Sequence, residues 1–172
     1  MSPVAARVTQ DLIRLKELSK ISNSKIKILR SSGSPVNHIE IELCYPTIPS
    51  NNYPITRQET SVVHINLLDS YPIPPPRLTV TTPIFHPNVY INGLICLGSW
   101  KPTEFLDFLV KRIVHTICFD PRYVNPSSPA NHLASVWYME KLRTNPGLFP
   151  TVDLSTLFIN TPPRPNSIFR NP

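Results

Sequence analysis

The segment TTPIFHPNVYINGLICLGSW, residues 81–100, places His86 and Cys96 ten positions apart among apolar, turn-forming and small polar residues. A catalytic cysteine needs solvent access, a route to its thiolate and donors that stabilise a developing oxyanion, whereas a buried cysteine needs only space. Cys96 lies between Ile95 and Leu97, and these apolar neighbours favour a place in the core.

The residues around Cys96 also carry turn signals and lack a sustained helical or strand period. An Asn92-Gly93 pair precedes the cysteine, and Gly98 and Ser99 follow it. Irregular surface segments of this kind commonly carry reactive groups. These residues alone leave two interpretations open: a nucleophile, or a small residue that fills the core.

The three cysteines, Cys44, Cys96 and Cys118, have a wide and irregular spacing. This spacing predicts neither a disulfide framework nor a CxxC metal pair, and it indicates a reducing cytoplasm. Cys44 shares the polar side of an expected strand with two glutamates and a histidine, where a solvated sheet surface is favoured over a metal cluster. Cys118 follows an apolar helical stripe and is expected in the core.

The composition is typical of one soluble domain, with 172 residues, 41% hydrophobic and 16% charged, although 21 prolines predict many ordered turns. We find no leader-like N-terminus and no run of about eighteen apolar residues, so we expect a soluble, cytoplasmic protein. The net charge is +6, but the basic residues are dispersed. We therefore expect neither nucleic acid nor a membrane as a partner.

The N-terminal segment predicts a helix from about residue 3 to residue 20, with Ser2 as N-cap and Pro3 at the first helical position. Its apolar face is formed by residues at helical spacing, Ala5, Val8, Leu12 and Leu15. The other face carries four basic residues, Arg7, Arg14, Lys16 and Lys20. That face is either a solvated surface or a docking surface for an acidic partner.

Four strands are expected next. Alternating residues predict a hairpin over 25–45 with a turn at 32–35, followed by strands within 61–70 and 77–82. The stiff YPIPPP segment, 71–76, favours a cis peptide bond. Helices then follow over 101–119, with Thr103 as N-cap, and from Ser128 and Pro129 to about Arg143. The order predicts an α+β fold, an antiparallel meander with helices packed on one sheet face.

We divide the chain into a core domain, 1–144, and a proline-rich C-terminal tail, 145–172, because the last part shows no sustained period. Four apolar residues are expected to attach the tail to the body, namely Leu148, Phe149, Leu157 and Phe158. The TPPRP sequence near the end, 161–165, has two interpretations, a polyproline ligand or a disordered terminus, and we favour the terminus.

Five motifs together resemble the ubiquitin-conjugating enzymes in order and spacing. These are YPIPPP, TPIFHPN, the Asn-Gly turn, ICL, and a tryptophan with a proline close behind it. Each motif alone is weak, but the set is specific, and the similarity covers roughly residues 3–143. The resemblance implies a UBC-like fold and a ubiquitin-like protein carried as a thioester on Cys96. It would be received from an ATP-dependent activating enzyme and passed to an amine of a protein substrate. No cofactor or metal is implied.

The same resemblance assigns roles around the cysteine. Asn88 matches an asparagine that stabilises the oxyanion or holds the neighbouring loop, and His86 matches a histidine that braces this loop. Pro87 belongs to the same His-Pro-Asn frame and is assigned a supporting role. We therefore do not expect His86 to act as a general base.

Partner contacts follow by the same comparison. Ile73 and Pro102 resemble apolar positions that contact a ligase where one is used, although ordinary loop packing is an equal alternative. The basic face of the first helix, with Arg7 and Arg14, would meet the activating enzyme.

The sequence departs from the familiar family pattern beyond Cys96. Only Gly98 and Ser99 separate Leu97 from Trp100, and a tail replaces a final helix. The short segment and the YVNPSSP sequence, residues 123–129, resemble the prokaryotic branch, which is found in ubiquitin-like conjugation systems linked to antiphage defence.

The segment opposite the cysteine, DPRYVNPSSP, forms the gate of the expected site. It places Asn125 where an aspartate is usual, and by the resemblance we assign Asn125 to the catalytic residues, as a group that orients the incoming lysine. Asp120 and Tyr123 are assigned supporting roles.

Two other classes of function compete with the enzyme. A non-catalytic adaptor of the same fold would bind a ubiquitin-like protein without carrying it, but such variants lack the cysteine. A cysteine hydrolase would need a histidine beside the thiol, and no histidine is placed there by the sequence.

Overall fold

The computed structural model describes residues 2–150 and 152–158, a helix followed by four strands and then further helices. The three α-helices are α1 (Pro3–Ile21), α2 (Leu106–Ile117) and α3 (His132–Thr144). The strands are β1 (Ile26–Gly33), β2 (Val36–Leu43), β3 (Ser61–Asn66) and β4 (Arg77–Val80). Two short 3-10 helices follow α3, η1 (Pro146–Leu148) and η2 (Ser155–Phe158).

The four strands form one antiparallel sheet in the order β1-β2-β3-β4. Ile41 of β2 lies opposite Val63 of β3, and both side chains are fully buried. The intervening residues of β2 and β3 are only partly buried, so the sheet has one apolar face and one polar face. The predicted α+β meander is therefore confirmed, and the predicted cis peptide bond lies at Tyr71-Pro72.

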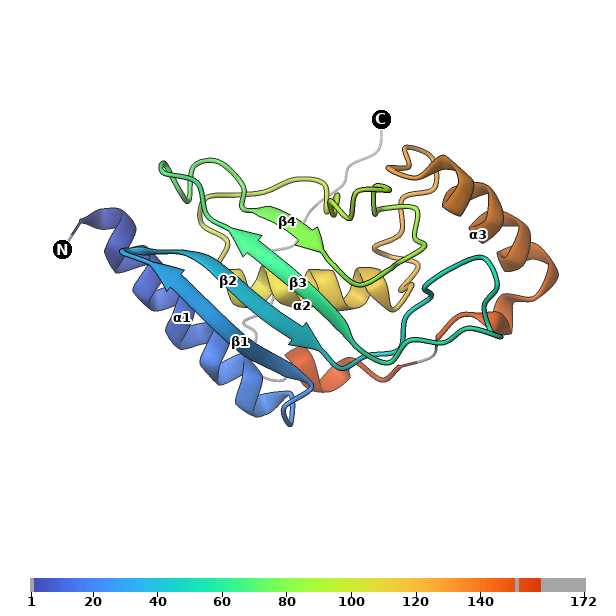
Figure 1. Ribbon diagram of the computed structural model, residues 1–172, viewed down its shortest axis with the longest axis horizontal. Coiled ribbons are helices and arrows are strands. Elements are labelled where there is room, and N and C mark those ends of the chain that lie inside the picture. Colours follow the sequence, from blue (N-terminus) through green and yellow to red (C-terminus); the bar gives the residue numbers. More distant parts are fainter. Residues whose placement is uncertain (1, 151, 159–172) are drawn as a thin grey trace, which may run out of the picture.

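Helices α1 and α2 cover the apolar face of the sheet, and α3 lies beyond its end (Figure 1). The main core joins apolar residues of the sheet to those of both helices, for example Leu15 and Ile113. A smaller core beneath α3 is formed by Ile48, Phe119 and Tyr138. Cys118 is buried in the main core as predicted, and this burial raises the pKa of its thiol to about 12.

Helix α1 begins as the sequence predicts, because the Ser2 side chain accepts a hydrogen bond from the Ala5 N–H and Pro3 occupies the first helical position. The predicted N-cap of the next helix, Thr103, is wrong. Helix α2 begins at Leu106, whose N–H donates to the carboxylate of Asp11 on α1, 2.9 Å away. A residue from another helix therefore satisfies the backbone group that Thr103 was expected to satisfy.

The predicted start of the third helix is also too early. Helix α3 begins at His132, and its N-cap is Asn131, whose side-chain oxygen accepts from the Ala134 N–H at 3.1 Å. Ser128 and Pro129 belong to the preceding turn. A neighbouring backbone contact explains the difference, because the N–H groups of Ala130 and Asn131 donate to the Pro87 carbonyl before the helix starts.

The segment after α3 packs against the body as far as it is described. Leu154 and Leu157 are buried in the main core, and Phe149 packs on the smaller core. Leu148 is half-buried. The side chain of Phe158 and the TPPRP sequence lie outside the described residues, and the division at residue 144 stays a prediction. None of the described helices is long and apolar enough to cross a membrane.

Candidate active site

Cys96 is exposed because it follows a buried residue in an extended segment. The Ile95 N–H donates to the Leu78 carbonyl of β4 at 3.0 Å, and Ile95 forms an isolated bridge with Val89. Ile95 is buried, so the alternation of an extended chain turns the Cys96 side chain outward. The Cys96 N–H donates to the Asn88 carbonyl at 2.8 Å, which joins the two halves of the motif.

The turn before the cysteine depends on Gly93. Its φ is +82°, and an added Cβ would lie 2.2 Å from the Val80 backbone oxygen. Only glycine tolerates both the left-handed conformation and this close approach. The Val80 N–H in turn donates to the Gly93 carbonyl at 2.9 Å, so the turn is held against β4.

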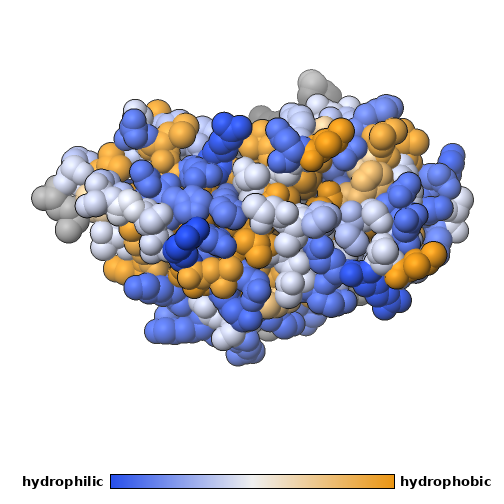
Figure 2. Space-filling model, in the orientation of Figure 1, coloured by the Kyte–Doolittle hydropathy of each residue, from blue (hydrophilic) through white to orange (hydrophobic). Residues whose placement is uncertain are grey.

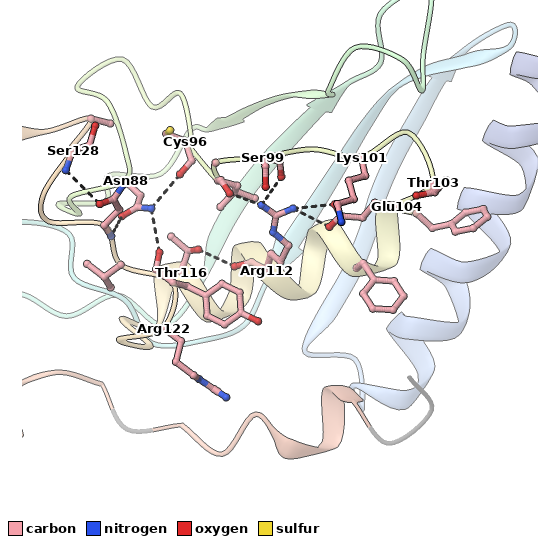
Figure 3. Close-up of a pocket in the computed structure, with 18 residues that line it drawn as sticks. Asn88, Cys96, Ser99, Lys101, Thr103, Glu104, Arg112, Thr116, Arg122 and Ser128 are labelled. Atoms are coloured by element: carbon pink, nitrogen blue, oxygen red, sulfur yellow. Dashed lines mark hydrogen bonds and ion pairs between the residues drawn. The ribbon is translucent and has the colours of Figure 1, made fainter. Parts of the chain in front are cut away.

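The side-chain amide of Asn88 hydrogen-bonds to three backbone groups, one in the Cys96 loop and two in the gate. Its Nδ2 donates to the carbonyl of Cys96 at 3.2 Å and to the carbonyl of Tyr123 at 3.1 Å, while its Oδ1 accepts from the Asn125 N–H at 3.0 Å (Figure 3). Both amide hydrogens are therefore used on carbonyl groups. In this arrangement Asn88 holds the loop of Cys96 and the facing gate segment together.

His86 is completely buried, and its Nδ1 accepts from the Asn88 N–H at 2.9 Å. Its ring packs on Phe119 with 4.3 Å between centroids. Burial lowers the pKa of His86 to about 3, and the Thr116 backbone opposes this shift. A neutral, buried imidazole whose Nδ1 is occupied cannot serve as the base for an amine at the surface.

The gate segment carries Asn125, which is exposed and lines the same groove as Cys96. Its side-chain Oδ1 accepts from the Ser127 hydroxyl at 3.1 Å and from the Ser128 N–H at 3.3 Å. The oxygen therefore closes the gate turn, and the NH₂ group, a donor only, is the part of the amide left to meet a ligand.

Asp120 lies at the base of the gate and is fully engaged. Its carboxylate accepts from the Arg122 side chain at 2.7 and 3.0 Å and contacts His115 Nδ1 at 2.7 Å. The hydrogen bonds from Arg122 hold the pKa of Asp120 well below its usual range. The Tyr123 ring stacks on His115, 4.8 Å between centroids. Asp120 is thus a fixed anion that orders the gate.

Sequence reasoning missed Arg112, which holds the segment after Cys96 onto α2. Its guanidinium pairs with both oxygens of Glu104, at 2.8 and 3.1 Å, and donates to the carbonyls of Leu97 and Ser99 (Figure 3). The only sequence signal is a basic residue within the apolar pattern of 106–117.

Asp11 was also missed, although it lies on the apolar face of α1 between Val8 and Leu15. It is completely buried, and its carboxylate accepts from Arg7, from the Tyr71 hydroxyl and from the α2 N-terminus. A carboxylate on an otherwise apolar helical stripe is the signal that could have identified it.

Arg7 does not belong to the solvated basic face that the sequence predicts. Its side chain is only 13% exposed, because it contacts Asp11 and donates to the Tyr71 hydroxyl and to the carbonyls of Pro102 and Glu104. The ion pair with the buried carboxylate of Asp11 holds the Arg7 guanidinium against the protein body. Arg14 stays exposed, with its guanidinium 3.8 Å from the Phe105 ring centroid.

The residues around Cys96 form a groove of about 770 Å³. It runs from the gate, with Asn125 and Tyr123, past Cys96 to the segment around Lys101 and Phe105. The structure thus brings Cys96, Asn88, Tyr123 and Asn125 together, with His86, Pro87 and Asp120 directly behind them.

The expected partner-contact residues do not line the groove themselves, although Pro102 lies between Lys101 and Thr103, which do. Ile73 is 75% exposed, Pro102 is exposed, and the Trp100 indole joins their two loops by donating to the Pro72 carbonyl at 2.8 Å. Within the described part of the chain, the one close group of three metal-ligating side chains also lies elsewhere, on the outer face of the sheet.

This arrangement agrees with a family match. The model of the family described as "Ubiquitin-conjugating enzyme" matches residues 14–145, most of the chain. The chain belongs to the ubiquitin-conjugating enzyme family. Membership rests on this match.

Curated relatives are similar over shorter stretches. The chain is 38% identical over 79 residues to ubiquitin-conjugating enzyme E2 2 of Mycosarcoma maydis, covering 44% of this chain and 40% of that protein. It is 35% identical over 88 residues to ubiquitin-conjugating enzyme E2 1 of Caenorhabditis elegans, covering 49% and 44%. The matched stretch therefore spans less than half the length of these relatives.

Solved structures share the fold at low sequence identity. Human ubiquitin-conjugating enzyme E2 G1 has a TM-score of 0.52 at 19% identity, covering 69% of this chain and 99% of that chain. Ubc12 of S. cerevisiae has a TM-score of 0.58 at 19% identity, covering 81% and 72%. These similarities establish the UBC fold and nothing finer.

Proposed function

We propose that the chain is an active ubiquitin-conjugating enzyme that carries a ubiquitin-like protein as a thioester on Cys96 and transfers it to a lysine amine of a protein substrate. The observation that carries this proposal is the exposed Cys96 thiol, held over the His86-Pro87-Asn88 frame in an open groove. A merely structural cysteine has no need of that exposure, and Cys118 illustrates the buried alternative.

The chemistry requires two acyl transfers. In the first, the Cys96 thiolate attacks the thioester carbonyl carbon of the ubiquitin-like protein on its activating enzyme, and the activating enzyme's sulfur leaves as a thiolate. In the second, a lysine amine attacks the same carbon, a C–N bond forms, the bond to the Cys96 sulfur breaks, and the nitrogen loses a proton. The ATP-dependent activating enzyme supplies the free energy, so this chain needs no cofactor.

The surrounding residues act mainly by position. Asn88 keeps the Cys96 loop and the gate at a fixed separation, and Asn125 lines the path of the incoming amine. Neither Asp120 nor His86 is placed to accept the amine's proton, since one is a paired anion and the other is buried. The proton therefore leaves to solvent or to a group of the substrate.

We further propose a prokaryotic origin in an antiphage conjugation system, supported by the short segment between Leu97 and Trp100 and by the YVNPSSP gate. A cytoplasmic, reducing setting is supported by three free thiols. Arg14 is the candidate contact for the activating enzyme, and the exposed Ile73 and Pro102 are the candidates for a ligase. The core domain is proposed to be 1–144.

The decisive experiment incubates the chain with an activating enzyme, its ubiquitin-like protein and ATP, and resolves the products without and with a thiol reductant. We expect a conjugate that disappears with reductant, is absent in Cys96→Ala and persists in the control Cys44→Ala. A reductant-sensitive conjugate that survives in Cys96→Ala would overturn the assignment. Stable non-covalent binding with no conjugate would instead indicate an adaptor.

A further inference from the structure

The outer face of the sheet carries a group of side chains that the conjugation chemistry does not use. His38 and Glu40 lie on β2, and His64 lies directly opposite Glu40 on β3. Their candidate ligand atoms, one from each residue, all lie within 4.8 Å of one another. This face points away from α1 and α2, and Figure 2 looks onto it, with hydrophilic residues over the middle of the sheet.

The hydrogen bonding of His38 prepares it to bind a cation. Its Nδ1 lies 2.7 Å from Oδ1 of Asn66, the residue opposite it on β3. An amide oxygen only accepts, so Nδ1 carries the proton and Nε2 keeps its lone pair. A histidine that ligates a metal commonly donates its other ring N–H to a carbonyl oxygen in this way.

Glu40 supplies an oxygen ligand beside the two imidazoles. Arg30 contacts its Oε2 at 3.2 Å, but the arginine side chain is 68% exposed, so this pair is weak. Among the described residues, Oε1 of Glu40 has no hydrogen-bond partner, and it can ligate while Arg30 stays in place. The rings of His38 and His64 lie with their centroids 5.1 Å apart.

We propose that His38, Glu40 and His64 form a binding site for a divalent transition-metal ion, Zn²⁺ by preference, on the outer face of the sheet. Two imidazoles and one carboxylate are ligands that suit Zn²⁺ and do not suit Mg²⁺ or Ca²⁺, which prefer oxygen ligands throughout. Tetrahedral coordination at about 2.0–2.1 Å brings ligand atoms to roughly 3.4 Å from one another. Modest rotation of the three side chains on this open face brings their ligand atoms from within 4.8 Å of one another to that spacing.

Such an ion would bind β2 to β3 and leave a fourth coordination position toward solvent, for water or a side chain of a partner. The site is separate from the Cys96 groove, so its test is independent of conjugating activity. The thiols of Cys44 and Cys96 are competing ligands, and both are replaced by alanine in the protein used for the measurement.

The experiment titrates metal-free protein, without a histidine tag, with ZnCl₂ in a calorimeter and follows thermal unfolding with and without the ion. We expect one Zn²⁺ per chain and a raised unfolding temperature, since an ion that binds only the folded state stabilises it. His38→Ala and His64→Ala should each weaken binding by at least about tenfold, and Asn66→Ala by about 10- to 100-fold. MgCl₂ should give neither effect.

Two matched variants sharpen the test. His132→Ala removes an exposed histidine on α3 and should leave Zn²⁺ affinity unchanged, whereas Arg30→Gln removes a competing positive charge and should tighten binding. His38, His64 and Asn66 are half-buried and Arg30 and His132 are exposed, and the unfolding curves verify that each variant folds. Unchanged affinity in both His38→Ala and His64→Ala, or no binding up to millimolar Zn²⁺, would overturn the proposal.

Discussion

At the scale of single residues, the site depends most on the Asn88 amide. Three of its hydrogen bonds reach backbone groups of the Cys96 loop and of the gate, segments far apart in the sequence. The sequence resemblance offered two roles for this residue, oxyanion donor or loop brace. The occupied donors favour the brace, because stabilising an oxyanion would require Asn88 to release a carbonyl first.

Substitutions of Asn125 are expected to change the discharge of the thioester to an amine without changing the charging of Cys96. Its Oδ1 closes the gate turn, so Asn125→Asp keeps that acceptor and places a second carboxylate oxygen where the NH₂ group now lines the groove. We expect Asn125→Asp to discharge to free lysine several-fold faster near neutral pH, where an amine of reference pKa about 10.4 is almost fully protonated. Asn125→Ala should charge normally and discharge more slowly, because the gate turn loosens.

The measurement for Asn125 is a single-turnover chase of purified thioester with free lysine across a pH series. Ser127→Ala serves as the control, since it removes one contact to the same oxygen and leaves the amide in place. Equal discharge rates in wild type and Asn125→Ala would remove this residue from the transfer step.

His86 predicts a pH dependence of stability. Burial lowers its pKa from 6.5 to about 3, so the unfolded chain takes up a proton that the folded chain does not. This contribution to stability is present above pH 6.5 and is lost as the pH falls from 6.5 toward about 3, by up to about 1.4 kcal/mol per pH unit. Urea unfolding at several pH values should show this slope, diminished in His86→Gln.

His132→Gln is the control for the pH series, because His132 is exposed at the start of α3. It should keep the wild-type slope. The assignment to His86 fails if His86→Gln shows the same loss of stability in acid as the wild type does.

At the scale of elements, α2 is the platform for the segment after the cysteine. Arg112 is anchored in the buried helix, and its guanidinium reaches two carbonyls and one carboxylate of that segment. The pair with Glu104 is only 19% and 18% exposed, so it is not screened as a surface pair would be. The ion pair of Arg112 and Glu104 therefore stabilises the fold and also fixes the position of the loop after Cys96.

We predict that Arg112→Gln lowers the free energy of unfolding by about 1–3 kcal/mol, because it leaves partly buried acceptors without their donor. Charging of Cys96 should also slow, since the loop beyond Leu97 loses its anchor. Arg112→Lys should have a stability and a charging rate between those of wild type and Arg112→Gln, because an ammonium group lacks the planar fork of a guanidinium. Urea unfolding and single-turnover charging test this, with Arg143→Gln, exposed on α3, as the control.

The elements themselves and the start of α1 were predictable, whereas the starts of α2 and α3 were not. Helical period and a local cap defined α1, and alternation defined β2 and β3, because those signals are contained in the segments themselves. The start of α2 was wrong because its capping group is Asp11, 95 residues earlier in the chain. A cap supplied by another helix leaves no trace in the sequence near the helix that it caps.

At the scale of the whole molecule, the site depends on contacts between segments that are distant in sequence. Cys96 and Asn88 were predicted from one short motif, but the approach of Tyr123 and Asn125 depends on how α2 and α3 frame the gate. The position of the Arg7 side chain could not be predicted from the sequence for the same reason. Its place in the sequence suggested a solvated face, and tertiary contacts with Asp11 and the segment at Pro102 drew it inside.

The described residues after α3, 145–150 and 152–158, contribute to the core, and none of them lines the groove. Leu154 and Leu157 are buried in the main core, where η2 contacts α1, whereas the groove-lining residues end at Ala130. Stability and charging should therefore respond differently to truncation. A chain that ends after Phe158 keeps both leucines and should match the full chain in unfolding temperature and in charging.

A chain that ends after Thr144 loses both leucines and Phe149, which packs on the smaller core. Burying each leucine contributes about 1.5–3 kcal/mol, so we expect the unfolding temperature to fall by roughly 10 °C or more. Below that temperature the shortened chain should still charge, because its groove is complete. Calorimetry and the thioester assay on both truncations test this prediction. A folded chain ending at Thr144 that cannot be charged would show that the later segment takes part in the active site or in the activating-enzyme interface, and the proposed boundary of the core domain would then move to include it.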